Sequence, residues 1–209
     1  MAYVLGFFAA DGYITVNKRG GQFWCIQTTD KELLQGIKKV IGADHKISIR
    51  LPRKINENIS YRLQIGSIEM CDDLRKLGFS ERKTKNLVIP NIPKKYFSSF
   101  VRGYFDGDGN IWQGEIHKER KTKHLVLKLS FTSCSYEFLK KLHDKLLLFG
   151  LGEGCIYKPK NKRFCRLQYS TLDALKLYDL MYNDNIRDLS CLFLDRKKVI
   201  FEKYKSLRP

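Results

Sequence analysis

Two aspartates stand at equivalent places in two similar segments of this 209-residue chain. Asp11 closes the apolar segment Val4–Gly12 and Asp108 closes Val101–Gly109, each just before the final glycine. Both segments have the spacing of short helices, so each carboxylate would face the negative end of a helix dipole, at a cost of roughly a few tenths of a kcal/mol. An unfavourable placement that occurs twice indicates a functional site.

Two such carboxylates suit the hydrolysis of phosphodiesters. The reaction needs a neutralised phosphate, an activated water and a stabilised leaving oxygen, all of which Mg²⁺ held by carboxylates can provide. Asp-Gly is also ordinary turn chemistry after a helix. Because it occurs in matching repeats of a strongly basic chain, we prefer the interpretation as a catalytic pair, with Asp11 and Asp108 addressing two strands.

Glycines inside the two apolar helices also require an explanation. Gly6 and Gly103 would each cost up to about 1 kcal/mol relative to alanine. Close approach of the two helix backbones would compensate, so we expect these glycines at a helix interface between the two repeats. The glycines that follow the aspartates, Gly12 and Gly109, suit the left-handed stop of a helix.

An internal repeat organises the whole chain. The motif segments lie 97 residues apart, and Arg62–Gln64 answers Arg166–Gln168 at a similar distance of 104 residues. Prolines break the helical pattern between the repeats, so we expect a linker within residues 80–98. We therefore predict an N-terminal half over residues 1–92 and a C-terminal half over residues 93–209.

Within each half the hydrophobic spacing switches between helix and strand. Residues 30–42 and 135–150 have helical spacing with capping residues at their ends. Residues 46–51 and 62–65 alternate as strands with one wet and one buried face do. The predicted fold class is α+β, with two pseudo-symmetric αββαββα halves and antiparallel sheets backed by helices. The residues expected on the buried face of the first stretch are Ile47, Ile49 and Leu51.

The open faces of these sheets would be polar and basic. Such a face can lie in the DNA major groove, where Arg reads guanine and Gln reads adenine through paired hydrogen bonds. A solvated strand position is the simpler explanation for any one residue, but the pattern as a whole favours a nucleic-acid surface. The predicted DNA-contacting residues are Lys46, Ser48, Arg50, Arg62, Gln64, Lys128, Arg166 and Gln168.

Composition restricts the possible partners. Thirty-nine Lys and Arg against 22 Asp and Glu give a net charge of +17, which favours a polyanion. Apolar runs fall short of the roughly 18 residues of a membrane span, and no secretion signal opens the chain. We expect an intracellular protein, in the cytoplasm, nucleoid or an organelle, with no membrane partner. The six scattered cysteines are expected to be reduced and mostly buried.

The paired segments resemble the LAGLIDADG motif that defines a family of homing endonucleases. Gly6 and Gly103 match the inner glycine of the motif, while Asp11–Gly12 and Asp108–Gly109 match its terminal Asp-Gly. The similarity of motif, repeat and length extends over nearly the whole chain.

The resemblance implies a monomer whose sheets form a saddle on a long, asymmetric site in double-stranded DNA. It implies site-specific cleavage of both strands with 3′ overhangs, in the service of intron or intein homing. Asp11 and Asp108 would be catalytic and bind Mg²⁺, with the carbonyls of Ala10 and Gly107 as further ligands and Gln27 near the active-site waters. Mn²⁺ would substitute, whereas Ca²⁺ would support binding without efficient cleavage.

Other positions match the family less directly. Many relatives have a lysine beside each catalytic centre, and Lys128 and Lys46 are the candidates here. The stretch Leu192–Tyr204 should form an amphipathic helix; we prefer a helix that closes the second half, with snorkelling lysines, over one that contacts phosphate. Asp106, matched by Ala9 in the first motif, is interpreted as a local hydrogen-bonding partner.

Two other functions remain open on the sequence. The resemblance extends to RNA-binding maturases that assist intron splicing, and a basic surface alone does not distinguish DNA from RNA. A non-cleaving DNA-binding protein would use the same scaffold, although retention of both Asp11 and Asp108 argues against it.

Overall fold

The computed structural model describes residues 1–209 apart from 53, 82–85, 118, 120–123, 184–191 and 208–209. Its internal contacts divide the chain into two compact units. Unit 1 comprises Met1–Lys83, Pro90–Gly107 and Arg187–Phe193, and unit 2 comprises Thr84–Ile89, Asp108–Ile186 and Leu194–Pro209. The boundary between residues 92 and 93 stays a prediction, and residues 82–85 of the expected linker lie outside the described residues.

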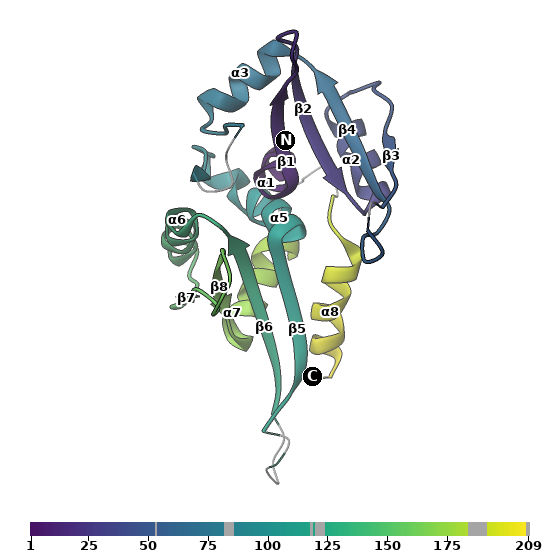
Figure 1. Ribbon diagram of the computed structural model, residues 1–209. Helices are drawn as coiled ribbons and strands as arrows, with labels where there is room; N and C mark the ends of the chain where they lie inside the picture. The colour runs from purple at the N-terminus through teal and green to yellow at the C-terminus, as the bar shows by residue number, and fades with distance from the viewer. Residues whose placement is uncertain (53, 82–85, 118, 120–123, 184–191, 208–209) are drawn as a thin grey trace. The chain divides into compact units, whose positions relative to one another are not determined.

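Unit 1 is built on an antiparallel sheet, sheet A, with strand order β1-β2-β4-β3 (Figure 1). Its strands are β1 (Gly12–Val16), β2 (Gln22–Thr28), β3 (Ser48–Arg50) and β4 (Ser60–Gly66). Its helices are α1 (Ala2–Asp11), α2 (Lys31–Val40), α3 (Ile68–Lys76), the short 3-10 helix η1 (Lys94–Tyr96) and α5 (Phe97–Asp108), which belongs to unit 1 as far as Gly107.

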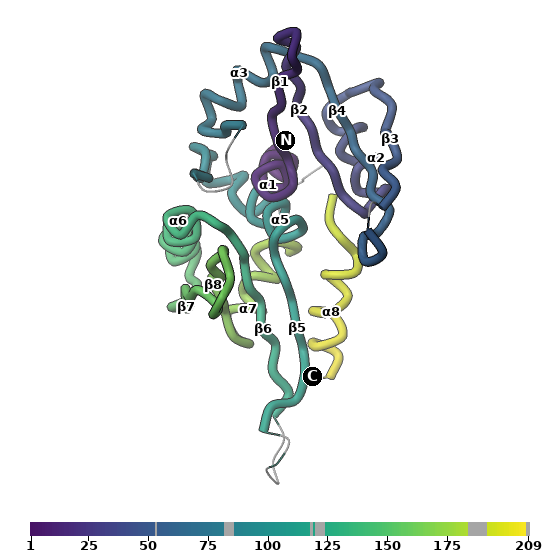
Figure 2. Tube along the Cα trace, in the orientation of Figure 1, coloured from purple at the N-terminus to yellow at the C-terminus, as the bar shows by residue number. Residues whose placement is uncertain are grey.

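Unit 2 repeats this order of elements around sheet B, in which the strands run β5-β6-β8-β7. Its strands are β5 (Gly109–Ile116), β6 (His124–Ser133), β7 (Cys155–Tyr157) and β8 (Cys165–Tyr169). Its helices are α6 (Tyr136–Leu147), α7 (Thr171–Tyr178), the π-helical turn η2 (Asp179–Asn183) and α8 (Asp195–Ser206). Figure 2 shows the chain passing twice through the same hairpin-helix-hairpin course, which confirms the predicted α+β fold with two similar halves. No helix in the described ranges is long and apolar enough to cross a membrane.

The helices behind the sheets begin and end at the predicted residues. Asp30 precedes α2, and Gly42 after it has a left-handed φ of 65°. Ser135 caps α6 by accepting a 3.2 Å hydrogen bond from the backbone N–H of Phe138, and Gly150 ends the turn with a φ of 81°. Side-chain caps and left-handed glycines therefore define both helices.

The glycines after the two aspartates do not end their helices in the predicted way. Gly12 is extended, with φ −85° and ψ 160°, and Gly109 has no positive φ either. The prediction of a left-handed stop is wrong because α1 continues directly into β1, where Gly12 pairs with Ile26. Glycine is needed for space instead, since a Cβ at position 12 would lie 2.0 Å from Cδ2 of Phe8.

The first alternating stretch is also only partly as predicted. Ile47 is half-buried, but Ile49 and Leu51 are 62% and 74% exposed. In the described structure α2 packs mainly on β2 and β4, so the three-residue edge strand β3 has no comparable cover. Alternation in the sequence indicated the strand but not the extent of the helix layer behind it.

The thiols are more exposed than predicted. In the described chain they divide into buried Cys25 and Cys71, partly exposed Cys165, and exposed Cys134 and Cys155. Burial raises the pKa of the Cys25 and Cys71 thiols. Cys155 is exposed because it pairs with Gln168 on the open face of sheet B, whereas Cys191 lies outside the described residues.

Candidate active site and nucleic-acid interface

The helices α1 and α5 cross at two glycines within unit 1. A Cβ on Gly6 would lie 2.1 Å from the carbonyl oxygen of Phe100, and one on Gly103 would lie 2.1 Å from the carbonyl oxygen of Tyr3. These are backbone atoms, which cannot rotate away as the end of a side chain can. Both positions therefore need glycine, and the close contact compensates for its poor helix propensity.

The same crossing contains a buried polar contact. The hydroxyl group of Tyr3 donates a 2.7 Å hydrogen bond to Oδ2 of Asp106, whose side chain is only 2% exposed. The guanidinium of Arg102 lies 5.5 Å from the centre of the Tyr3 ring. Asp106 is thus a hydrogen-bonding partner, although its partner belongs to the other motif helix.

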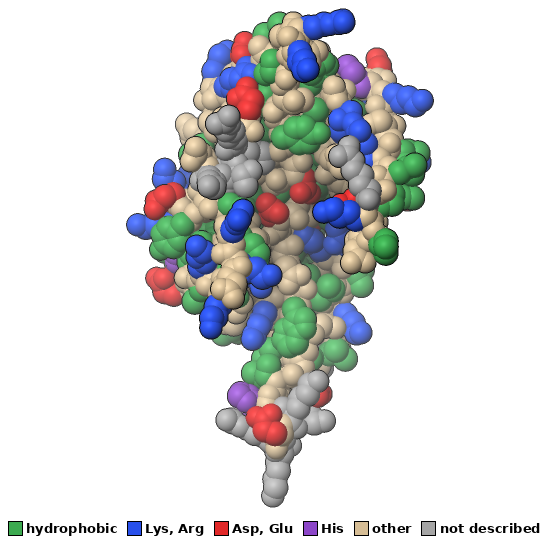
Figure 3. All heavy atoms as spheres, viewed as in Figure 1, with side chains coloured by type: hydrophobic (Ala, Val, Ile, Leu, Met, Phe, Trp, Pro, Cys, Tyr) green, Lys and Arg blue, Asp and Glu red, His purple; other side chains and the backbone are tan. Residues whose placement is uncertain are grey.

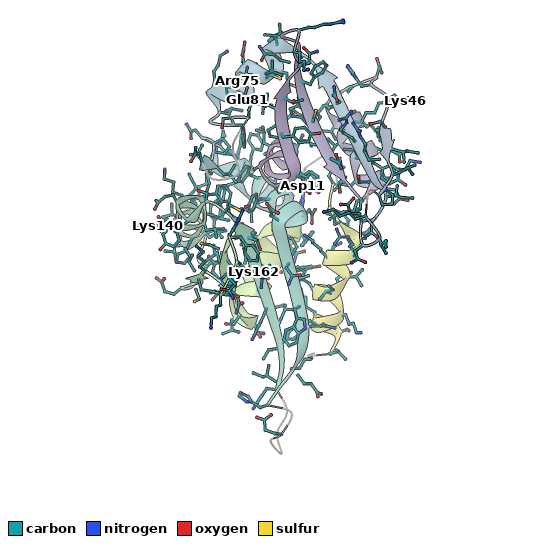
Figure 4. All side chains as sticks on the ribbon, in the orientation of Figure 1. Asp11, Lys46, Arg75, Glu81, Lys140 and Lys162 are labelled. Atoms are coloured by element: carbon teal, nitrogen blue, oxygen red, sulfur yellow. The ribbon has the colours of Figure 1, made fainter. Side chains whose placement is uncertain are left out.

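The two crossing helices end in the candidate catalytic aspartates. Asp11 is the last residue of α1 (Figure 4) and Asp108 the last of α5, and both are partly exposed. A Cβ on Gly107 would lie 2.3 Å from Cβ of Ala10 and 3.4 Å from Oδ2 of Asp11. Glycine at position 107 therefore permits the last turns of α1 and α5 to approach each other beside the Asp11 carboxylate.

The groups around Asp11 fit a hard divalent cation. Mg²⁺ prefers oxygen ligands, and the predicted set consists of the Asp11 carboxylate and the carbonyls of Ala10 and Gly107, which lie in the last turns of their helices. Within the described ranges, no three or more His, Cys, Asp or Glu side chains are grouped to hold a metal ion. The set therefore suits a cation that shares its coordination with a substrate phosphate better than a closed structural site.

A buried lysine, missed in the sequence, lies beside the strand that follows Asp108. Lys197 in α8 is 6% exposed, and its Nζ donates a 2.6 Å hydrogen bond to the carbonyl oxygen of Gly109. The expectation that the lysines of this helix snorkel to solvent is wrong for Lys197. A signal existed, because Lys197 shares a helical stripe with Leu194 and Phe201, where an apolar residue is expected.

Gln27 lies on sheet A near the end of α1. Gly12 pairs with Ile26, so Gln27 is one residue further along β2, level with Asp11. Its Nε2 donates a 3.0 Å hydrogen bond to Oγ of Ser60 on the neighbouring strand. This bond orients an exposed amide at the end of the sheet.

The registers of the two sheets show which residues of the repeats correspond. In each sheet an arginine on the third strand of the order pairs with a polar residue of the second strand, followed two residues later by a glutamine. The pairs are Arg62 with Gln27 and Gln64 with Cys25 in sheet A, and Arg166 with Thr132 and Gln168 with Ser130 in sheet B. Thr132 is therefore the counterpart of Gln27.

The open face of sheet A is hollowed into a groove of about 850 Å³. Basic Arg50 and Arg62 and polar Gln27 and Ser60 contribute to its lining. The Nε atoms of both arginines are buried, and neither has an acceptor in the part of the chain that the structure describes. Figure 3 shows Lys and Arg side chains gathered along this β3–β4 side. Buried charged donors of this kind favour an anionic partner.

Sheet B has a smaller groove of about 250 Å³ on its open face. Its lining consists of Asn110, Trp112, Lys128, Ser130, Arg166 and Gln168. Tyr157 donates a 3.0 Å hydrogen bond to Oε1 of Gln168, which orients that amide. The buried Nε of Arg166 likewise has no acceptor among the described residues.

The structure brings five of the eight predicted DNA-contacting residues into these grooves: Arg50, Arg62, Lys128, Arg166 and Gln168. Ser48 instead donates a 3.3 Å hydrogen bond to the carbonyl oxygen of Arg62, and Gln64 is half-buried opposite Cys25. Lys46 precedes β3 and is exposed (Figure 4). The structure therefore groups the arginines with the sheet faces but leaves Lys46 outside a strand.

Comparison with known proteins identifies the family. The profile described as LAGLIDADG-like domain matches residues 1–78 and 96–179, which include both motif helices and both sheets. Among curated proteins, probable translation initiation factor IF-2 of Thermococcus kodakarensis is 32% identical over 136 residues, 60% of this chain and 10% of that protein. The protein of the same name from Methanocaldococcus jannaschii is 27% identical over 128 residues, 57% of this chain and 11% of that protein. The match thus spans about a tenth of these relatives.

Solved structures share the fold. Meganuclease I-SmaMI, bound to uncleavable DNA, has a TM-score of 0.65 and 15% identity over 99% of this chain and 87% of its own. The I-LtrWI LAGLIDADG homing endonuclease, bound to target DNA, has a TM-score of 0.61 and 15% identity over 99% of this chain and 88% of its own. Because the family profile covers both repeats and more than half of the sequence, the chain belongs to the LAGLIDADG-like family.

Proposed function

We propose that this chain is a monomeric, site-specific homing endonuclease that cleaves both strands of a long DNA site with Mg²⁺ and leaves 3′ overhangs. The observation that carries the proposal is the position of Asp11 and Asp108 at the ends of helices that cross through Gly6 and Gly103. Carboxylates repel phosphate, so a protein that only bound DNA would gain nothing from acids at both helix ends. A neighbour with this fold is described as bound to cleaved DNA, which supports the reaction class.

Asp11 and Asp108 each bind a divalent cation at their own helix end, and the carbonyls of Ala10 and Gly107 add ligands beside Asp11. When bound, the cation neutralises the phosphate and lowers the pKa of a water molecule. The donor set fits Mg²⁺, and a neighbour with uncleaved target in the presence of Ca²⁺ supports a divalent requirement. Gln27, held by Ser60, offers its Oε1 as an acceptor that orients an attacking water.

Lys197 adds positive charge near Asp108. Its bond to the Gly109 carbonyl keeps the ammonium group at the start of β5, where surface motion would otherwise carry a lysine away. A fixed charge in a poorly solvated place stabilises a developing negative charge more strongly than one in bulk water. We assign Lys197 to the phosphate at this end of the site.

The two grooves bind the DNA. Arg50, Arg62 and Arg166 are positioned to donate to phosphates or to guanine, and Gln168 to read adenine. The net charge of +17 supports a large number of phosphate contacts. Because such contacts release counterions, affinity should fall steeply as salt concentration rises.

The genetic context we propose is an intein. The matched segment makes up 10% of an initiation factor and also 10% of a component of the A-type ATP synthase from Methanopyrus kandleri, which is 25% identical over 114 residues, 54% of this chain. A module that recurs inside proteins with different names serves none of their separate roles. Carriage within a host protein therefore accounts for its distribution better than an intron origin does.

Selection from a randomised duplex library tests the proposal. Duplexes that bind in Ca²⁺ are recovered, transferred to Mg²⁺ and sequenced at both cut ends. We expect double-strand breaks with 3′ overhangs in Mg²⁺, binding with little cleavage in Ca²⁺, and a steep loss of binding with salt. A duplex that binds tightly yet stays intact in Mg²⁺ and Mn²⁺ would contradict the nuclease assignment, and preferential binding of structured RNA would favour a maturase.

A further inference from the structure

Trp112 is an unusual residue on the open face of sheet B. It is 44% exposed, whereas Trp24, the second tryptophan of the chain, is 3% exposed and stacks on Phe8. In the register of β5 and β6, Trp112 lies opposite Lys128, one step from the pair Asn110 and Ser130. The indole is the one large apolar side chain among the residues described as lining this groove.

The indole is held in a defined position. A Cβ at Gly114 would lie 2.4 Å from Cζ2 of Trp112, so the six-membered part of the indole covers the backbone of Gly114, two residues along the same strand. On the neighbouring strand, Nζ of Lys128 lies 5.8 Å from the centre of the ring. Glycine beneath the ring and a cation beside it orient the indole before any ligand arrives.

This arrangement restricts what the indole can recognise. The other lining residues, Asn110, Lys128, Ser130, Arg166 and Gln168, all carry hydrogen-bonding groups, which match the polar edges of bases. An indole has a single N–H donor and otherwise offers apolar carbon. The major groove of DNA presents one apolar group, the 5-methyl group of thymine.

We propose that Trp112 is a specificity-determining residue that recognises a thymine through apolar contact with its 5-methyl group. The inference rests on the proposed binding of DNA by sheet B. It also introduces an asymmetry, because the equivalent position of the first repeat, 97 residues earlier, is Thr15. The two halves of the target are therefore read differently at this position.

Replacing thymine by uracil tests the contact, because it removes only the methyl group. Each thymine of the duplex selected from the library is replaced in turn, and affinity is measured in Ca²⁺ by the anisotropy of a fluorescent end label. In the wild type we expect one position at which uracil weakens binding about fourfold, as for one methyl group withdrawn from apolar contact. In Trp112→Ala, thymine and uracil should bind equally at that position.

Two further variants make the test specific. Thr15→Ala, at the equivalent place in sheet A, should preserve the difference between thymine and uracil at the Trp112 position. Gly114→Ala should reduce the difference, because its Cβ displaces the ring without removing it. Circular dichroism and unfolding midpoints establish that each variant is folded.

Tryptophan fluorescence gives an independent measurement. Trp24 is buried, so a change in emission on adding the selected duplex should come from Trp112 and disappear in Trp112→Phe. The inference is overturned if anisotropy reports binding while emission is unchanged, if no thymine is sensitive to uracil, or if the sensitivity persists in Trp112→Ala. Failure to bind any duplex would overturn the proposed function itself, and the inference with it.

Discussion

Nζ of Lys197 lies 2.6 Å from the carbonyl oxygen of Gly109, the residue that follows Asp108. The bond joins α8 to the first residue of β5 and buries an ammonium group that would otherwise be solvated. Lysine is almost never fully buried unless it is paired, so the position is costly for folding alone. That cost is most simply explained by a role at the adjacent aspartate.

Replacing the buried lysine should separate cleavage from binding. In Lys197→Met we expect the cleavage rate of the selected duplex to fall by about 100-fold or more, as for loss of one preorganised charge at a reacting centre, with little change in Ca²⁺ affinity. Single-turnover cleavage and anisotropy measure the two effects. Lys203→Met, on an exposed position of the same helix, is the matched control and should cleave normally. Equal loss in both variants, or normal cleavage in Lys197→Met, would rule out the assigned role.

Removing the negative charge of either aspartate should abolish cleavage and spare binding. Asp11→Asn and Asp108→Asn keep the side-chain volume but lose the anionic cation ligand, so we expect at least about a 100-fold slower reaction in Mg²⁺. Affinity in Ca²⁺ should be similar or slightly higher, because less negative charge faces the phosphates. Asp44→Asn, in an exposed loop, controls for the general effect of charge. Full activity of either motif variant would refute its metal-binding role.

Adding one methyl group at the helix crossing should destabilise the fold. In Gly6→Ala and Gly103→Ala the new Cβ meets backbone carbonyl oxygens at 2.1 Å, so the helices must separate, and we expect a loss of at least about 2 kcal/mol in the free energy of unfolding. Urea denaturation measures it. In Gly66→Ala the nearest atom is Cε1 of Phe23 at 3.3 Å, on a ring that can shift, so the loss should be much smaller. Similar losses at all three positions would show that close helix approach is not the cause.

Thiol footprinting can identify the face that contacts DNA. Cys155 is exposed and pairs with Gln168 on the open face of sheet B, whereas Cys165 pairs with Ser133 and points to the opposite face. The selected duplex should therefore slow alkylation of Cys155 and leave Cys165 unaffected. Peptide mass spectrometry after brief iodoacetamide treatment measures both rates. Protection of Cys165 alone would place the DNA on the wrong face for our proposal.

The sequence predicted the fold well because its strongest signals are local or repeated. Caps and left-handed glycines bound α2 and α6, and the repeated Arg-x-Gln triplets occupy equivalent registers in the two sheets. Predictions failed where distant packing decides the outcome. Ile49 is exposed because α2 does not extend over β3, and Gly12 is extended because Phe8 fills the space beside it.

The candidate site was predicted only in part for the same reason. Asp11 and Asp108 could be recognised from their unfavourable position at helix ends, which the motif itself shows. Lys197 could not be paired with Gly109 from sequence, because the two are 88 residues apart and only tertiary packing brings them together. Trp112 was missed because a single aromatic residue in a strand is usually buried, and its exposure depends on which face the register assigns to it.

The division of the chain into units has a consequence for its synthesis on the ribosome. Unit 1 takes α5 from residues made after Lys83, and it also includes Leu192, whose Cδ2 would be 2.5 Å from a Cβ on Gly36 of α2. The nascent first repeat therefore emerges with the α5-facing side of α1, around Tyr3 and Phe7, still uncovered. Its apolar surface waits for α5, and its last contact waits for a residue near the end of translation. Early release of the chain would leave a sticky, incomplete unit rather than an independent half.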